Sequence, residues 1–170
     1  MLHLTFPTHL AMGYLLGVYT RFPIAYLVVG SVLPDLVDRP LYWLGLTPFT
    51  HTVAHSVAVA VPASLLLTSL FGRRGAALSL GWLVHIGTDF LNVATTQGLS
   101  ATPYYVFFLG PPPDEQAAFE TVTIVLPVTD ITHTLHPVVL ALEVVVLGWA
   151  VVAILRERSV LSRVRGARAD

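Results

Sequence analysis

Long runs of apolar residues dominate the chain, and short polar or proline-containing breaks separate them. Three runs, residues 53–71, 76–94 and 137–155, have the roughly 17–25 residues that a helix needs to cross the hydrocarbon core of a bilayer. Each run therefore predicts one membrane-spanning helix.

The N-terminal apolar run, residues 4–37, is broken by "TRFP" at positions 20–23. This break predicts a tight hairpin of two shorter helices, at about residues 8–19 and 23–33, with the second ending before Pro34 because proline disfavours a helical interior. The later stretch "FETVTIVLPV" fits either a short strand or a segment at the membrane interface, and the triple proline before it excludes regular helix there.

Composition supports a membrane protein. Apolar residues make up 55% of the chain and charged residues only 11%, with a mean hydropathy of +0.74, whereas a soluble domain carries about 25% charged residues. A chain of 170 residues has too high a surface-to-volume ratio to bury so much apolar surface. We therefore expect an all-α, multi-pass membrane bundle of about five helices with a long outer loop.

The arginines predict the orientation of these helices. Arg21, Arg73 and Arg74 fall in loops, and five more arginines follow the last apolar run; the positive-inside rule places all of them on the cytoplasmic side. The N-terminus is then outside and the C-terminus inside the cell membrane. We expect residues 1–156 to form the membrane-embedded domain and residues 157–170 a basic cytoplasmic tail.

Acids and histidines recur as closely spaced pairs. "VLPDLVDRP", "HTVAH", "HIGTD" and "HTLH" each contain two such groups three or four positions apart, which is the spacing of side chains on one helix face. The predicted orientation places most of them near the outer side, with His85 about 15 Å deep. Imidazole and carboxylate ligands without any cysteine suit a catalytic rather than a structural zinc, or another first-row metal.

Each group also has a simpler interpretation when it is taken singly. His9 could cap the first helix, Asp35 could be a turn acid, and Arg39 could pair only with Asp38. His133 and His136 could be interfacial loop residues. Glu143, two turns into the last helix, could be a buried polar partner. Taken together, with His85 and Asp89 inside one predicted span, the groups favour a shared site.

Four motifs follow one another in a familiar order. "PTHLAMGYLLG", "GSVLPDLVDRP", "THTVAHS" and "HIGTDFLNVATTQG" resemble the pattern of the LexA-regulated, membrane-bound metal-dependent hydrolases, over about residues 7–103. That family is in turn similar to zinc-dependent phospholipase C and the fungal single-strand nucleases. The resemblance implies a helical, metal-dependent hydrolase acting on a phosphoester.

The resemblance also implies roles for particular residues. The motif positions that match, and that would bind one to three divalent ions, most simply zinc, are His9, Asp35, His55, His85 and Asp89. The sequence departs from the family at Asp38, which comes one residue late, and at Thr52 and Ala54. These departures argue against Asp38 and His51 as direct ligands. Asp38, His51 and His136 are expected to be catalytic or orienting groups, and Arg39 to pair with a phosphate.

The expected activity is hydrolysis of a phosphoester, such as a lipid head group, at the outer membrane face. Membrane lipid is the expected partner, and the net charge of −1 argues against nucleic acid. The alternative is a non-enzymatic membrane protein that binds or transports a metal or protons. A zinc protease is disfavoured because "HTVAH" lacks the glutamate of His-Glu-x-x-His.

Overall fold

The structure is a computed structural model that describes residues 5–47, 51–96, 98–99, 103, 122–126, 131–135 and 137–166. Within these ranges the chain forms five helices and one pair of strands: α1 (Thr5–Tyr19), α2 (Ile24–Trp43), α3 (Val57–Phe71), α4 (Arg73–Thr96), β1 (Val122–Leu126), β2 (Ile131–Leu135) and α6 (Pro137–Gly166).

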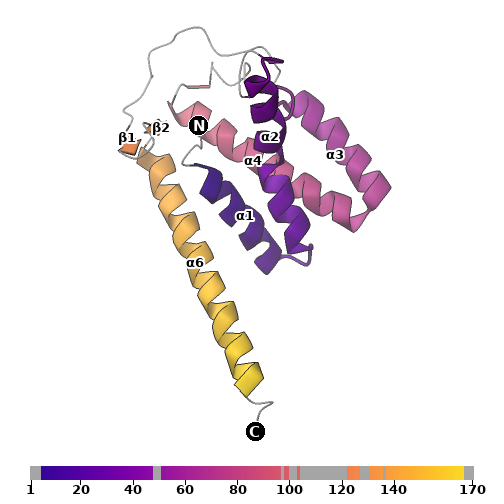
Figure 1. Cartoon of the computed structure of the whole chain (residues 1–170), viewed down its shortest axis with the longest axis vertical. Helices are drawn as coiled ribbons and strands as arrows, with labels where there is room; N and C mark the ends of the chain where they lie inside the picture. The colour runs from indigo at the N-terminus through magenta and orange to yellow at the C-terminus, as the bar shows by residue number, and fades with distance from the viewer. Residues whose placement is uncertain are drawn as a thin grey trace.

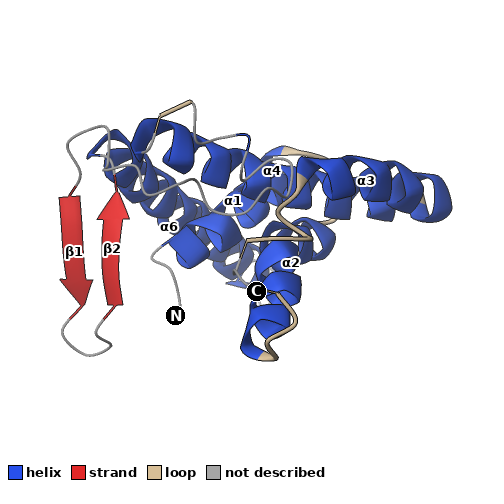
Figure 2. Ribbon diagram, turned by 90° about the horizontal axis from the view of Figure 1, so that it is seen from above, coloured by secondary structure: helices blue, strands red, loops and turns tan. Residues whose placement is uncertain are grey.

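The helices form one bundle in which α2 and α4 make the largest contact. Helix α1 packs on α2, helix α3 packs on α4, and α6 packs along α1 and then extends beyond the bundle (Figure 1). Strands β1 and β2 pair in antiparallel register, with Val122 opposite Leu135 and Leu126 opposite Ile131, and the hairpin stands at one side of the bundle (Figure 2). The predicted helical bundle is confirmed, and β1 lies within residues 119–128, for which a short strand was one of two interpretations, whereas β2 lies beyond them.

Helix α2 is longer than predicted. It continues through Pro34 and Pro40 to Trp43, although proline lacks the N–H of an interior helical residue and costs about 3 kcal/mol there. The prediction that the helix ends at Leu33, with Asp35 and Asp38 at its outer end, was therefore wrong. Both acids lie within the helix and are buried.

Close backbone contact joins α2 to α4. A Cβ atom added to Gly30 would collide with the backbone carbonyl of Leu78, and one added to Gly81 would collide with the carbonyl of Leu27. Two helices can approach this closely only where both carry small residues. The glycines thus bring the acids of α2 within reach of the histidine of α4.

Few large apolar side chains are buried. The main buried cluster is Ala54, Ala60, Trp82 and Ile86, whereas many leucines, valines and aromatic residues are exposed on α3 and α6. Among the described residues, one helical segment, Pro137–Glu157, is long and apolar enough to cross a membrane, so α4, where a span was predicted at residues 76–94, does not meet this criterion. The predicted span at residues 53–71 is corrected: α3 is apolar, but it begins at Val57 and has 15 residues.

Candidate metal centre

The carboxylate of Asp38 organises the segment before α3. Its oxygens accept hydrogen bonds from the backbone N–H groups of Thr52 (2.9 Å), Ala54 (3.0 Å) and His55 (3.2 Å). The indole N–H of Trp82 donates to the carbonyl of Ala54 at 2.7 Å. These bonds hold residues 52–55 in a turn, which explains why α3 starts four residues later than its apolar run.

Asp38 also orients the ring of His55. His55 Nδ1 lies 2.8 Å from Asp38 Oδ2, and both side chains are buried. An ionised carboxylate only accepts hydrogen bonds, so Nδ1 carries the hydrogen. In the neutral ring, His55 Nε2 then carries no hydrogen, and its lone pair points away from Asp38.

The ring of His85 is oriented in the same way by the backbone. Its Nδ1 lies 2.7 Å from the carbonyl oxygen of Ser31 on α2. A carbonyl only accepts hydrogen bonds, so here too Nδ1 is the donor and Nε2 the free lone pair. The contact depends on the close approach of α2 and α4 at Gly30 and Gly81.

The two free ring nitrogens face each other. His55 Nε2 and His85 Nε2 are 3.2 Å apart, and Asp89 Oδ2 lies 3.5 Å from the first and 3.2 Å from the second. Two imidazole lone pairs and a carboxylate oxygen cannot hydrogen-bond one another unless a proton lies among them. A cation at the centre of the three atoms satisfies all of them at once.

The spacing of the three atoms suits zinc. With Zn–N and Zn–O bonds of about 2.0–2.1 Å, the edge of a tetrahedral ligand set is about 3.3–3.4 Å. The observed edges, 3.2, 3.2 and 3.5 Å, fall around that value. The arrangement therefore fits a tetrahedral site with three protein ligands.

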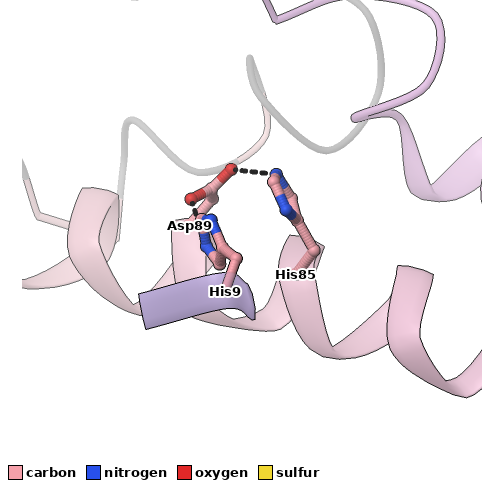
Figure 3. Close-up of side chains that lie close together, drawn as sticks. All are labelled: His9, His85 and Asp89. Atoms are coloured by element: carbon pink, nitrogen blue, oxygen red, sulfur yellow. Dashed lines mark ion pairs between the residues drawn. The ribbon is translucent and has the colours of Figure 1, made fainter. Parts of the chain in front are cut away.

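His9 extends the centre on the other side of Asp89. Its Nε2 lies 3.4 Å from Asp89 Oδ1, so the two carboxylate oxygens of Asp89 pair with different histidines, Oδ1 with His9 and Oδ2 with His85 (Figure 3). The rings of His9 and His85 stack with centroids 3.8 Å apart. Among the described residues neither nitrogen of the buried His9 ring has a hydrogen-bond partner, which is unusual for a buried polar group and fits a ligand position.

All five residues predicted as ligands lie in this region. Ligand atoms within 4.8 Å of one another come from three overlapping groups: His9, His85 and Asp89; Asp35, His55 and His85; and His51, His55 and Asp89. Several histidine and aspartate groups could thus hold a metal ion. We call the residues of these three groups the metal centre.

The other predicted site residues have varied positions. The ring of His51 lies 4.4 Å from that of His55 between centroids. Arg39 pairs through Nε with Asp35 at 2.9 Å, one turn earlier on α2 than Asp38, the partner considered from the sequence. His136 lies outside the described residues, and His133 lies in β2 opposite Ile124.

Two supporting groups have no signal in the sequence. The Ser31 carbonyl and the backbone N–H groups of residues 52–55 belong to the main chain, and every residue but proline offers such groups. Only the arrangement of α2, α4 and the turn selects them.

Comparison of the chain with protein-family models, with curated proteins and with solved structures finds no match.

Proposed function

We propose that the chain is a membrane-bound, metal-dependent hydrolase that cleaves a phosphoester, with a lipid head group at the outer membrane face as its substrate. The observation that carries the proposal is the convergence of His55 Nε2, His85 Nε2 and Asp89 Oδ2 at 3.2–3.5 Å. Three protein ligands that leave a fourth position to water are typical of catalytic zinc. The resemblance of four ordered motifs to the LexA-regulated hydrolases supports the same function.

A zinc ion held there would lower the pKa of a water molecule toward about 7 and hold phosphoryl oxygens. The chain's own residues prepare the site for it. Asp38 and the Ser31 carbonyl fix which nitrogen of each ring is free, and Arg39 offsets the charge of Asp35. His51, beside His55, is placed to take up or release a proton.

The exposed surface supports a membrane protein with several spans, and the arginines of the loops support its N-terminus outside. Large apolar side chains of α3 and α6 are exposed: Leu65, Leu66, Leu70 and Phe71, with Val144, Val145, Val151 and Leu155. A soluble monomer rarely leaves such contiguous apolar faces in water. In a bilayer these faces contact lipid, and the substrate head group reaches the metal centre laterally.

His85→Ala tests the assignment. We expect the detergent-purified variant to lose at least half of its bound zinc, measured by mass spectrometry of the metal, and all zinc-dependent hydrolysis of a fluorogenic phosphodiester. Glu157→Gln is the control, because Glu157 pairs with Tyr14 away from the metal centre. Wild-type metal content and activity in His85→Ala would refute the proposed site.

One observation favours the alternative of a transport protein. Glu143 lies in the candidate span Pro137–Glu157 and is buried, and among the described residues its carboxylate oxygens have no hydrogen-bond partner. Ionisable groups within a span are common in proton and ion pathways. Zinc uptake into proteoliposomes that is lost in Glu143→Gln, without phosphodiester hydrolysis by the wild type, would favour transport.

A further inference from the structure

A second polar feature lies where the α1–α2 turn and the α3–α4 turn meet. Arg21, Pro23, Arg73 and Arg74 line an open surface cavity of about 360 Å³. None of the lining residues is acidic, and among the described residues no carboxylate pairs with these three guanidinium groups. The cavity thus concentrates positive charge that the described part of the chain does not neutralise.

The chain backbone builds this cavity. Gly72 ends α3 with a positive φ of 54°, a conformation that favours glycine, and α4 then begins directly at Arg73. The free N–H groups of the first turn of α4 add their dipole to the two arginine charges. Arg74 is positioned by Tyr26 of α2, whose ring centroid lies 5.9 Å from the guanidinium carbon.

Apolar and aromatic side chains flank the arginines in sequence. Tyr19 precedes Arg21 by two positions and is 60% exposed, and its hydroxyl accepts a 2.7 Å hydrogen bond from the indole of Trp149. Leu70 and Phe71, just before Arg73, are more than 60% exposed. Aromatic residues beside arginines are typical of the level of lipid head groups. A phospholipid has both a phosphate for the arginines and acyl chains for these exposed apolar side chains, whereas a water-soluble anion has only the charge.

We propose that the cavity of Arg21, Arg73 and Arg74 binds the phosphate of an anionic phospholipid. Guanidinium groups bind phosphate oxygens through paired, charge-assisted hydrogen bonds. The lipid bridges the two helical turns and so ties α1 and α2 to α3 and α4.

This site is separate from the metal centre: it rests on the proposed membrane-embedded bundle but not on the proposed hydrolysis. Arg74 and Asp89 are fifteen residues apart on α4, which is about 22 Å along the helix axis. The bound lipid therefore stabilises the bundle at the opposite membrane face. It is not the substrate of the metal centre.

Lipid retention tests the proposal. The full-length protein is equilibrated in micelles with equal amounts of phosphatidylglycerol and phosphatidylcholine, and the lipids that stay bound are counted by native mass spectrometry. We expect the wild type to retain phosphatidylglycerol, and the triple variant Arg21→Gln, Arg73→Gln, Arg74→Gln to retain about tenfold less. The charge-matched control, Arg163→Gln, Arg165→Gln, Arg168→Gln, should retain as much as the wild type.

Two more measurements distinguish lipid binding from misfolding and from binding of a free anion. If the glutamine triple variant does not fold, the lysine triple variant, which keeps the charge, should lose part of the bound lipid because lysine cannot form paired bonds. Equal lipid retention in all variants, or an equal loss in the control, would overturn the proposal. A different result would be that inorganic phosphate raises the unfolding temperature of a wild type that shows no preference for phosphatidylglycerol. That result would assign the cavity to a free anion and overturn the proposal of lipid binding.

Discussion

Single side chains decide what the candidate metal centre can bind. His55 and His85 can offer Nε2 to a metal ion because each ring has its Nδ1 engaged, by Asp38 in one case and by the Ser31 carbonyl in the other. The partner of the non-ligating nitrogen sets the tautomer and the orientation of a metal-binding ring. Asp38 has an additional task, since it also holds the backbone of the turn that carries His55.

Asp38→Asn should therefore weaken metal binding without removing a ligand. The amide has one acceptor oxygen and no charge, so it cannot satisfy all the N–H groups that now meet the carboxylate. We expect the zinc affinity, measured by calorimetric titration, to fall about 10–100-fold. Wild-type affinity in this variant would show that Asp38 does not orient His55.

At the scale of elements, the interface of α2 and α4 positions the centre. Helix α2 carries Ser31, Asp35 and Asp38. Helix α4 carries His85 and Asp89. The glycines of the two helices meet at the point of closest approach. A methyl group added at either glycine would push the two helices apart and move the Ser31 carbonyl away from His85.

Gly81→Ala tests this interface against a matched control in the same helix. The added Cβ of residue 81 meets the backbone of α2, whereas a Cβ on Gly87 has no neighbour within 4 Å. We expect Gly81→Ala to destabilise the protein by about 1–3 kcal/mol and to reduce bound zinc. Gly87→Ala should be neutral or stabilise by up to about 1 kcal/mol, since alanine is the better helix former.

Unfolding in detergent, followed by circular dichroism, measures both variants. Equal stability of the two would mean that α2 and α4 do not meet closely at Gly81.

The whole molecule is organised around two ends of one bundle. The metal centre lies near the start of α1 and the second half of α4 (Figure 1), and the arginine cavity lies at the α3–α4 turn. Between them the described helices expose apolar side chains. In the proposed membrane protein, these exposed apolar side chains contact the lipid between the two polar ends.

Single cysteines can test the orientation, because the chain contains none of its own. Leu99, after α4, and Phe71, at the end of α3, are both well exposed. We expect a membrane-impermeant maleimide to label Leu99→Cys in intact cells, and Phe71→Cys only after permeabilisation. The reverse pattern would contradict an N-terminus outside, and labelling of both in intact cells would contradict a membrane-embedded bundle.

Local sequence patterns were enough to predict the helical character of the bundle and the candidate ligands. The four-residue spacing of His85 and Asp89 placed them on one helix face, and the break at residues 20–23 separated α1 from α2. These features follow from periodicity and backbone preferences, which act over a few residues and can be read locally.

The extent of α2 and the contacts between the histidines follow only from the packing of the whole chain. Helix α2 continues past Pro34, against the preference of that residue, and so carries Asp35 and Asp38 into the bundle. The 3.2 Å approach of His55 and His85 depends on the Ser31 carbonyl and on the close-packed glycines of α2 and α4. Such contacts join residues far apart in the chain, and their energies come from packing and desolvation, which no short stretch of sequence specifies.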